Sequence, residues 1–544
     1  MPIILRRRTA VVLALAAAAS AIPSLHAQSF LVAEATVASV HRAFDGKRLT
    51  CRALVQQYLD RIAAYDKAGP ALNAIQHVNP RALAEADSLD AVQRAGGARG
   101  TLHCVPVLLK DQVETRDMPT TYGSVIFKDF VPLRDATIVA KLKGAGAIIL
   151  AKTTMGEFAG RYVGSAAGIV RNAYDPSRNP SGSSSGSGSA VAANFGLVGI
   201  GEDTGGSIRG PAAVSSLVGL RPTLQLVSRF GMMPANPTQD VLGPMTRTVT
   251  DAALVLDVIA GYDPKDPITA AAVGNMPPSY TAMLNTNALR GARIGVLRVR
   301  RDTSTATPRD TTGSDSVIRP DSLARARRAE FAKVLPLMDR ALADLRAQGA
   351  EVIDSLVAPV VPGRRVSNDF ETEQATDRYL AEHPNAPVKT FKEIILAGTV
   401  NPWRARSMID YIGKTINDPD YLAMVLYRDA MRTAVLKLMA DHRLDALVYL
   451  TYDAATTPIA ADVLTNPRPT DGYGLGDNRG LSPTIGFPAL TVPAGFTVDK
   501  LPIGLEFLGR PFAEAQLLGF GYAYEQATNH RRPPQTTPVL APSR

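Results

Sequence analysis

The chain has 544 residues, of which 46% are hydrophobic and 20% are charged. This composition excludes a disordered chain and is ordinary for a soluble protein with one large core and insertions. The formal net charge of +9 does not indicate nucleic-acid binding, because the basic residues are scattered and arginine pairs such as Arg327-Arg328 and Arg531-Arg532 lie far apart.

Residues 1–27 have the pattern of an export signal. Arg6-Arg7-Arg8 precedes an apolar run from Val11 to Ile22, and cleavage is expected after Ala27. The arginines fit a twin-arginine signal as well as a general one, and the sequence does not separate the two routes. The run is too short to span a membrane comfortably. We therefore expect an exported protein, periplasmic or secreted, that has no stable membrane anchor and whose mature chain is 28–544.

The spacing of apolar residues predicts helices over 29–66 and then, from about residue 102, alternating strands and helices. The expected strands are 105–109, 147–151, 197–201, 446–450, 489–493 and 503–508. The expected helices are 135–143, 189–195, 322–348 and 513–528. This alternation indicates an α/β fold in which helices surround a sheet.

The region from about 300 to 437 breaks this rhythm. Residues 301–321 are rich in Thr, Ser, Asp and Arg, which is typical of an exposed loop. Residues 370–402 and 408–437 are expected to form helices that cover a cleft. We interpret 300–437 as a variable helical insertion, where substrate choice would be made.

The chain has two cysteines, Cys51 and Cys104. They could pair in an exported protein, but Cys51 opens a helical stretch while Cys104 begins the apolar segment that leads to Lys110. We therefore expect no disulfide, and the sequence alone does not show whether the two lie close together. Because no cluster of histidines and cysteines supplies ligands, we expect no metal and no cofactor.

The most informative segment is the turn Gly205-Gly206-Ser207. Two glycines before a serine let the backbone turn its amides toward one point, which suits an anion formed beside a nucleophile. Upstream lie a serine- and glycine-rich block, 181–187, that contains Ser183, and a lone lysine, Lys110, at the end of an apolar strand. Together these motifs predict a catalytic centre without histidine.

The same residues admit other interpretations. The serine-rich block alone would be a flexible linker. Its stretch 182–186 matches the nucleophile elbow of α/β-hydrolases, but that motif needs a preceding strand, and 175–180 is prone to form turns. A histidine base at His383, His442 or His530 is possible in principle, although each is more simply a surface or packing residue.

The lysine, the serine-rich block and the Asp-Thr-Gly-Gly-Ser-Ile-Arg turn together resemble the amidase signature family. The similarity continues through 218–223 and 240–245 and again from 493, so the core motifs cover about 100–265 and 440–530. The tail 521–527 is most similar to that of bacterial peptide amidases. The resemblance implies one amidase domain over 28–544, a single α/β/α sandwich around a central mixed sheet.

The resemblance also implies roles for individual residues. Ser207 would be the nucleophile that forms an acyl-enzyme, Ser183 a bridging serine after a cis peptide bond, and Lys110 the base. This chemistry is reasonable in itself, because a serine hydroxyl needs a proton acceptor and a neutral lysine can act through an intermediate hydroxyl. Burial among residues 107–109 would lower the lysine pKa from about 10.4.

Further roles follow from the same resemblance. The backbone N–H groups of Thr204, Gly205, Gly206 and Ser207 would form an oxyanion hole. Asp203 and Arg209 would brace the turn rather than react. Phe158, Ala159 and Ser183 would lie near the acyl group of the substrate.

The chain departs from the family pattern at four positions. Cys104, Ser181 and Ser185 stand where the family has glycine, and Glu202 stands where threonine is common. None of these changes removes a reacting group. We expect them to alter turn flexibility and the shape of the pocket.

The function that follows is hydrolysis of the C–N bond of a neutral small-molecule amide, without a metal, with release of ammonia or an amine. Carbamate or ester hydrolysis in the same site is an alternative. A glutaminase-type subunit of a tRNA amidotransferase is another, although the export signal argues against it. A catalytically inactive exported binding protein is the last. The acyl and amine groups of the substrate and the oligomeric state stay open.

Overall fold

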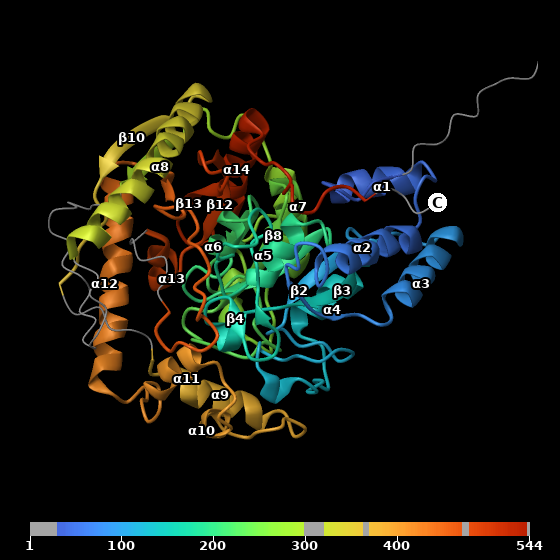
Figure 1. Ribbon diagram of the computed structural model, residues 1–544. Helices are drawn as coiled ribbons and strands as arrows, with labels where there is room; N and C mark the ends of the chain where they lie inside the picture. Colours follow the sequence, from blue (N-terminus) through green and yellow to red (C-terminus); the bar gives the residue numbers. More distant parts are fainter. Residues whose placement is uncertain (1–29, 299–319, 363–368, 470–477, 541–544) are drawn as a thin grey trace, which may run out of the picture.

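The computed structural model describes residues 30–298, 320–362, 369–469 and 478–540 (Figure 1). The expected signal segment 1–27 and nearly all of the expected loop 301–321 lie outside these residues. Within the described ranges, no helix combines the length and the apolar character that crossing a membrane requires.

Helices lie along the whole described chain and include all the segments in which the sequence predicted them. They are α1 (Val37–Asp45), α2 (Cys51–Tyr65), α3 (Ala82–Arg94), α4 (Thr137–Gly144), α5 (Ser185–Ala192), α6 (Arg209–Ala213), α7 (Val249–Ile259), α8 (Pro320–Ala347), α9 (Thr372–Ala381), α10 (Phe391–Leu396), α11 (Pro402–Ile409), α12 (Pro419–Asp441), α13 (Leu481–Ile485) and α14 (Glu514–Thr528).

The centre of the molecule is a mixed sheet of eleven strands within the described ranges, in the order β1-β3-β2-β6-β8-β7-β12-β13-β11-β9-β10. Its strands are β1 (Ile75–Val78), β2 (Pro106–Lys110), β3 (Ile148–Thr153), β6 (Val198–Asp203), β7 (Val218–Arg221), β8 (Val241–Thr246), β9 (Arg293–Leu297), β10 (Glu351–Leu356), β11 (Ala446–Leu450), β12 (Ala489–Phe496) and β13 (Pro502–Leu508). A separate two-stranded sheet pairs β4 (Val163–Gly164) with β5 (Gly168–Ile169).

Parallel and antiparallel pairs alternate across this sheet in blocks. Strand β2 runs parallel to both β3 and β6, and β11, β9 and β10 are parallel to one another. The strands between these blocks pair antiparallel, from β6 through β8, β7, β12 and β13 to β11. Because β2 has neighbours on both sides and is buried along its whole length, a side chain at its end lies deep in the molecule.

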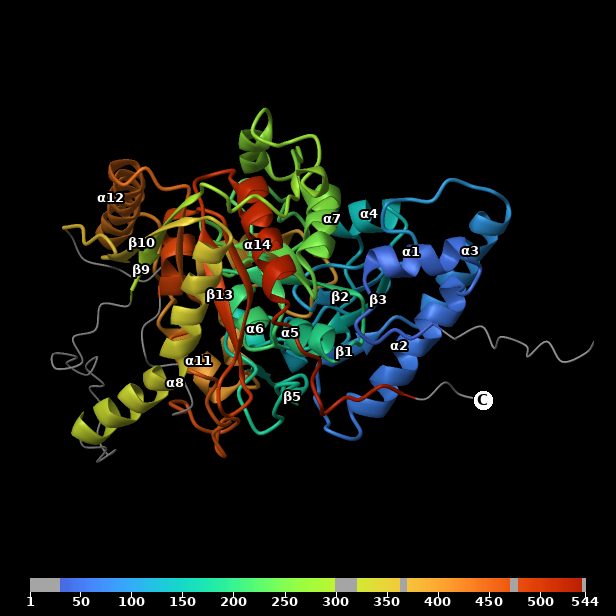
Figure 2. The same cartoon turned by 90° about the horizontal axis from the view of Figure 1, so that it is seen from above.

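Helices cover both faces of the sheet, as the α/β/α expectation requires. A Cβ placed at Gly504 would touch both Thr491 of β12 and Ala213 of α6, so Thr491 faces α6. A Cβ at Gly521 of α14 would touch Leu490, the neighbour of Thr491. Successive side chains of a strand point to opposite faces, so α6 and α14 lie on opposite sides. Figures 1 and 2 show α1, α2 and α3 at one end of the molecule and α8 and α12 at the other.

The helical insertion is more broken than the sequence predicted. The segment 370–402 was expected to be helical, and it contains two short helices, α9 and α10, separated by a stretch with Pro384 and Pro387. Proline lacks an N–H and clashes with the preceding turn, so it ends helices. The helix expected over 408–437 starts only at Pro419, in the first turn of α12, where proline is tolerated.

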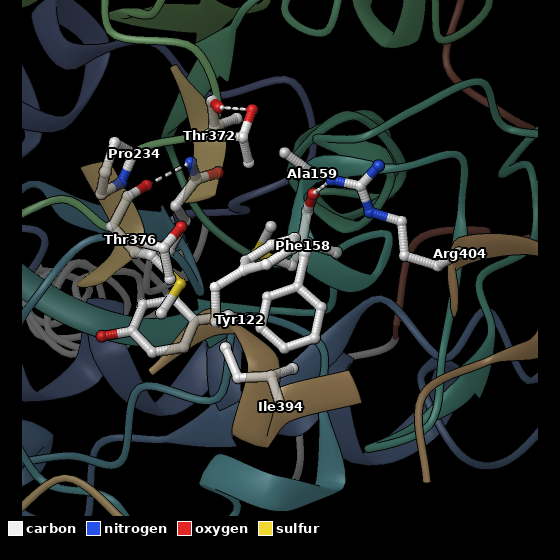
Figure 3. Close-up of a pocket in the computed structure, with 13 residues that line it drawn as sticks. Tyr122, Phe158, Ala159, Pro234, Thr372, Thr376, Ile394 and Arg404 are labelled. Carbon is white, nitrogen blue, oxygen red and sulfur yellow. Dashed lines mark hydrogen bonds between the residues drawn. The ribbon is translucent and has the colours of Figure 1, made fainter. Parts of the chain in front are cut away.

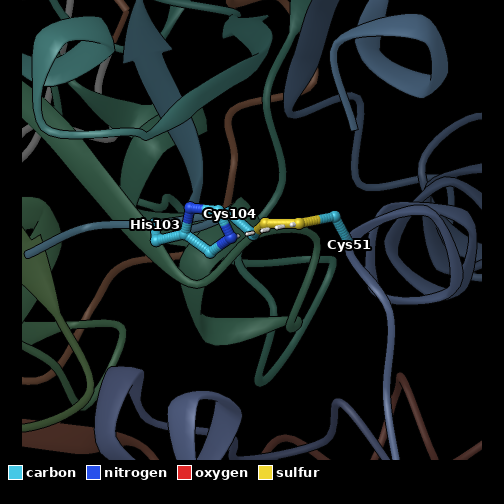
Figure 4. A group of neighbouring side chains, drawn as sticks. All are labelled: Cys51, His103 and Cys104. Carbon is cyan, nitrogen blue, oxygen red and sulfur yellow. Dashed lines mark hydrogen bonds between the residues drawn. A yellow bond between two sulfur atoms is a disulfide. The ribbon is translucent and has the colours of Figure 1, made fainter. Parts of the chain in front are cut away.

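The expectation that the cysteines would not pair was wrong: Cys51 and Cys104 form a disulfide, with their Cα atoms 5.5 Å apart (Figure 4). Cys51 is the first residue of α2 and Cys104 lies just before β2, so the bridge joins an outer helix to a central strand. The ring of His103 lies beside the two sulfur atoms, and in the described part of the chain these three residues form a potential metal-ligand group. The sequence pattern had indicated no such cluster. In the oxidised chain both sulfurs are bonded to each other.

We predict that this disulfide contributes to stability, because it closes a loop between residues separated by 53 positions. Replacing both cysteines with alanine should lower the free energy of unfolding by about 2–4 kcal/mol, measured by urea denaturation. The reductant-treated wild type should fall by a similar amount, and the reductant should leave the double variant unchanged. Two titratable thiols in the untreated native protein would contradict the pairing.

Candidate active site

Lys110 ends the central strand β2, and its side chain is completely buried. The preceding residues of the strand, which are apolar, are also buried between β3 and β6. Its Nζ donates to Ser183 Oγ at 2.8 Å and to the carbonyl of Glu202 at 3.2 Å. A charged or polar group at such depth needs partners of this kind. Two of the sequence-predicted residues are therefore in direct contact.

Ser183 is held in a tight turn just before α5. The Gly182–Ser183 peptide bond is cis, as the family resemblance implied. A Cβ at Gly182 would lie 1.6 Å from the carbonyl oxygen of Arg161, so only glycine fits beside that backbone. The carbonyl of Ser183 accepts from Gly156 N at 3.1 Å. Ser183 is buried, and its hydroxyl is turned toward the strand that carries Lys110.

Ser207 lies in the turn between β6 and α6 and is partly exposed. Its carbonyl accepts from Ser184 N at 3.4 Å, which brings the two serine segments side by side. The hydroxyl of Ser184 in turn bonds the backbone of Glu202 on β6, at 3.1 and 3.2 Å. The structure thus gathers all three predicted catalytic residues. Ser207 is the outermost of the three, while Ser183 and Lys110 are buried.

The Gly-Gly-Ser turn is shaped by Asp203. Its two carboxylate oxygens accept from Gly206 N at 2.7 Å and from Ile208 N at 3.1 Å. Gly206 has φ +124, a conformation that side chains rarely adopt. One of the four predicted oxyanion donors, the N–H of Gly206, is therefore engaged by Asp203. The role in binding an oxyanion stays a prediction for the N–H groups of Thr204, Gly205 and Ser207.

A buried cluster of charges fixes Asp203 in turn. Arg209 Nε lies 3.2 Å and Arg221 Nη1 3.2 Å from its oxygens, and Arg209 also pairs with Glu506. All four side chains are completely buried. Burial alone raises the pKa of Asp203, but the charges of Arg209 and Arg221 outweigh it and hold the pKa well below its usual range. These contacts lock the turn that carries Ser207.

A carboxyl group beside Lys110, and a second one linked to it through Thr204, were not recognised from the sequence. Glu202 Oε2 lies 2.7 Å from Lys110 Nζ, and both side chains are completely buried. The hydroxyl of Thr204 bridges Glu202 Oε1 at 2.5 Å and Asp240 Oδ1 at 2.7 Å. In the sequence, Glu202 stood out only as a departure from the family pattern. A charged residue at the end of a strand of small and apolar residues, 198–201, was the signal that could have identified it.

A second buried lysine lies near the first. Lys152, at the end of β3, pairs with Asp111 at 3.0 Å, and both are completely buried. Burial lowers the pKa of Lys152, and the charge of Asp111 opposes that shift. Its Nζ also donates to Thr120 Oγ1 at 2.8 Å. The aspartate that follows Lys110 in the sequence thus serves this neighbouring lysine.

A mainly apolar pocket lies under the helical insertion (Figure 3). Phe158 and Ala159, the residues expected near the substrate, both line it. Arg404 of α11 reaches the carbonyl of Phe158, while its buried Nε has no hydrogen-bond partner within the described part of the chain. The other lining residues are Gln112, Tyr122, Met155, Met233, Pro234, Ala235, Thr372, Thr376, Phe391 and Ile394. Helices α9 and α10 therefore cover the pocket, as the sequence predicted.

The insertion is anchored by Glu114. Its Oε1 accepts from Tyr379 of α9 at 2.7 Å and lies 2.8 Å from His383 Nε2. The Tyr379 hydroxyl also contacts that of Tyr122.

His383 thus has a packing role. His530 lies elsewhere in the chain, with its Nε2 3.4 Å from Asp344 Oδ2. Neither histidine is placed as the serine base that was considered as an alternative.

Comparison with known proteins identifies the family. A family model described as amidase matches residues 53–318 and 327–518, which is most of the chain. The chain belongs to the amidase family. A probable amidase from Arabidopsis thaliana is 32% identical over 537 residues, which cover 93% of this chain and 92% of that relative. This amidase is therefore an enzyme that cleaves amide C–N bonds.

Two further relatives span nearly the whole amidase. Native peptide amidase from Stenotrophomonas maltophilia, known from an X-ray structure, is 34% identical with a TM-score of 0.76, covering 93% of this chain and 99% of that one. One subunit of the glutamyl-tRNA(Gln) amidotransferase of Thermosynechococcus vestitus is 33% identical over 517 residues, 92% of this chain and 99% of that relative. Both relatives cover the site and the insertion alike.

We predict that Asp203→Asn destabilises the amidase by about 3–5 kcal/mol, because it leaves the buried Arg209 and Arg221 without their shared carboxylate. Turnover should fall as well, since the turn loses its brace. Asp175→Asn is the matched control, because Asp175 also caps a turn but is 38% exposed and should cost under about 1 kcal/mol. Equal urea midpoints for the two variants would show that the cluster does not hold the turn.

Proposed function

We propose that the amidase cleaves its substrate through an acyl-enzyme on Ser207, with Ser183 as the bridging acid–base group and Lys110 as the base. The observation that carries this proposal is the 2.8 Å hydrogen bond from Lys110 Nζ to Ser183 Oγ at the buried end of β2. The contact between Ser184 N and the carbonyl of Ser207 supports it, because it aligns the two serine segments.

The chemistry proceeds in two halves. Ser207 Oγ attacks the amide carbonyl and gives its proton to Ser183. Ser183 at the same time gives its own proton to the neutral amine of Lys110. Backbone N–H groups of the 204–207 turn bind the resulting oxyanion. The proton then returns through Ser183 to the departing nitrogen, and an amine or ammonia leaves. Water, activated by the same groups, hydrolyses the acyl-enzyme.

The pocket supports a substrate with an apolar or aromatic group. The rings of Tyr122 and Phe158 lie side by side with Ile394 next to them (Figure 3). The buried Nε of Arg404 has no hydrogen-bond partner among the described residues, and a carbonyl or carboxylate oxygen of the substrate would satisfy this donor. A neutral amide with an apolar group and one further acceptor oxygen matches the chemical character of this lining. Carbamates and esters of the same shape would use the same site.

The amidotransferase relative favours a second candidate, glutamine hydrolysis within a multi-subunit enzyme. The first 27 residues argue against it, and we propose that the amidase is exported and acts outside the cytoplasm. A mature protein that begins near Gln28 in a periplasmic or secreted fraction would support export. Glutamine turnover that requires partner chains would instead favour the second candidate.

Serine labelling tests the proposed roles. A phosphonyl fluoride should modify Ser207 alone, as located by peptide mass spectrometry, and Ser207→Ala should lose both the label and about 10⁴-fold or more of turnover. Lys110→Met should lower turnover by about 10²–10⁴-fold, because the serine then lacks its base. Ser189→Ala is the matched control: that serine is in the same segment but bonds the carbonyl of Arg171 at 2.8 Å.

The substrate panel should contain amides, carbamates and esters with small and bulky apolar groups, and turnover is expected on amides that carry an apolar group. The rate should also rise with pH into the alkaline range, because the base acts as a neutral amine. A label on another serine, or a chemistry-limited rate that is flat from about pH 5 to 9, would contradict the assignment.

A further inference from the structure

The position of Glu202 is unusual for a residue beside a lysine that must act as a base. Its Oε2 lies 2.7 Å from Lys110 Nζ, and neither side chain is exposed. A nearby negative charge favours the charged form of a lysine, whereas burial favours the neutral form. Glu202 therefore opposes the effect that would make Lys110 a base.

The hydrogen bonds of Lys110 match an ammonium ion. Its Nζ lies within bonding distance of three oxygens: Ser183 Oγ at 2.8 Å, the Glu202 carbonyl at 3.2 Å and Glu202 Oε2 at 2.7 Å. An ammonium ion has three hydrogens, one for each acceptor. An amine has only two, and its lone pair would have to receive the hydrogen of Ser183. The arrangement fits a resting enzyme in which Lys110 is protonated.

The second oxygen of Glu202 is also held. Thr204 Oγ1 lies between Glu202 Oε1 and Asp240 Oδ1, and its single hydrogen can serve only one of them. Burial, together with the charge of Glu202, raises the pKa of Asp240 to about 6. Asp240 is further held by backbone N–H groups, from Ala235 at 2.8 Å and Asn236 at 2.8 Å. Each oxygen of the Glu202 carboxyl thus has a polar neighbour, Lys110 Nζ at Oε2 and Thr204 Oγ1 at Oε1.

Charged groups from three neighbouring strands or their ends interact with Glu202. They are Lys110 on β2, Asp240 before β8, and Arg221 on β7. The hydrogen bonds of Arg221 go elsewhere, to Asp203 at 3.2 Å and to the carbonyl of Gln239 at 2.7 Å. Lys110 is therefore the cation that Glu202 directly contacts.

We propose that Glu202 is a positioning residue that holds Lys110 as an ammonium ion in the resting enzyme and so sets the pH above which Lys110 becomes a base. This inference rests on the proposed function. Glu202 does not touch the reacting atoms, and it acts through the lysine. Thr204 lies against the other oxygen of its carboxyl, between Glu202 and Asp240.

The test is the rate of phosphonylation of Ser207 as a function of pH, because this rate reports activation of the serine without depending on the choice of substrate. In Glu202→Gln the counter-charge is gone, so the pH of half-maximal labelling should fall by about 1–2 units. Below the wild-type midpoint, the variant should then be labelled about 10- to 100-fold faster. Glu202→Asp keeps the charge, and its midpoint should lie closer to that of the wild type.

Two further variants make the test decisive. Glu202→Thr introduces the residue common in the family at this position, and it should show the same acidic shift if the glutamine variant does not fold. Asp251→Asn is the matched control, since Asp251 is a buried carboxylate that accepts from Val37 N at 3.1 Å, and its midpoint should equal that of the wild type.

Midpoints of the glutamine and threonine variants that are unchanged, or that move to higher pH, would overturn the role of Glu202. Slower labelling at every pH with the midpoint preserved would also overturn it, because that result indicates a structural role alone. A wild type that is not labelled at any pH would overturn the proposed function and this inference with it.

Discussion

The active site depends on one constraint: a lysine side chain lies completely buried at the end of the central strand β2. A buried amine must have its hydrogens satisfied, whichever protonation state it adopts. The serine turn before α5 and the end of β6 supply the partners, Ser183 and Glu202, from two segments that fold against the strand. Because β2 has a neighbour on each side, the backbone that carries this lysine lies inside the sheet. The serine segment before α5 packs against it there.

Two consecutive residues of β6 serve two different networks. Glu202 contacts Lys110, while Asp203 pairs with Arg209 and Arg221 and accepts two N–H groups of the nucleophile turn. The first network bears on the protonation of the base, and the second on the shape of the turn that carries Ser207. Both are buried, so the loss of one partner leaves another charge without compensation. The pocket is shared between the two parts of the chain, because Tyr122 and Phe158 line it from the core region and Phe391 and Arg404 line it from the helical insertion.

The sequence predicted the parts of the molecule whose signal is local. Each of the six expected strands begins within one residue of an observed strand, because short apolar runs between turns have few alternatives. Strands β1, β7, β8, β9 and β10 were not predicted. The expected helix over 370–402 is split by prolines that were visible in the sequence. The disulfide was missed because the pairing of Cys51 with Cys104 depends on how α2 docks near β2, which no local pattern encodes. The contact between Glu202 and Lys110 was missed for the same reason.

The structure gives a physical meaning to two positions where the chain departs from the family pattern. Cys104 has φ +59 and Ser181 has φ +62, and both conformations favour the glycine that the family usually has there.

The central claim is that Ser207 becomes acylated while Ser183 and Lys110 lie behind it as a proton relay. A crystal structure of the phosphonylated enzyme tests this most directly. The account predicts a bond from phosphorus to Ser207 Oγ, a phosphonyl oxygen about 2.7–3.1 Å from backbone N–H groups of the 204–207 turn, and Lys110 Nζ still bonded to Ser183 Oγ. Phosphorus bound to Ser183, or a phosphonyl oxygen turned away from that turn, would contradict it.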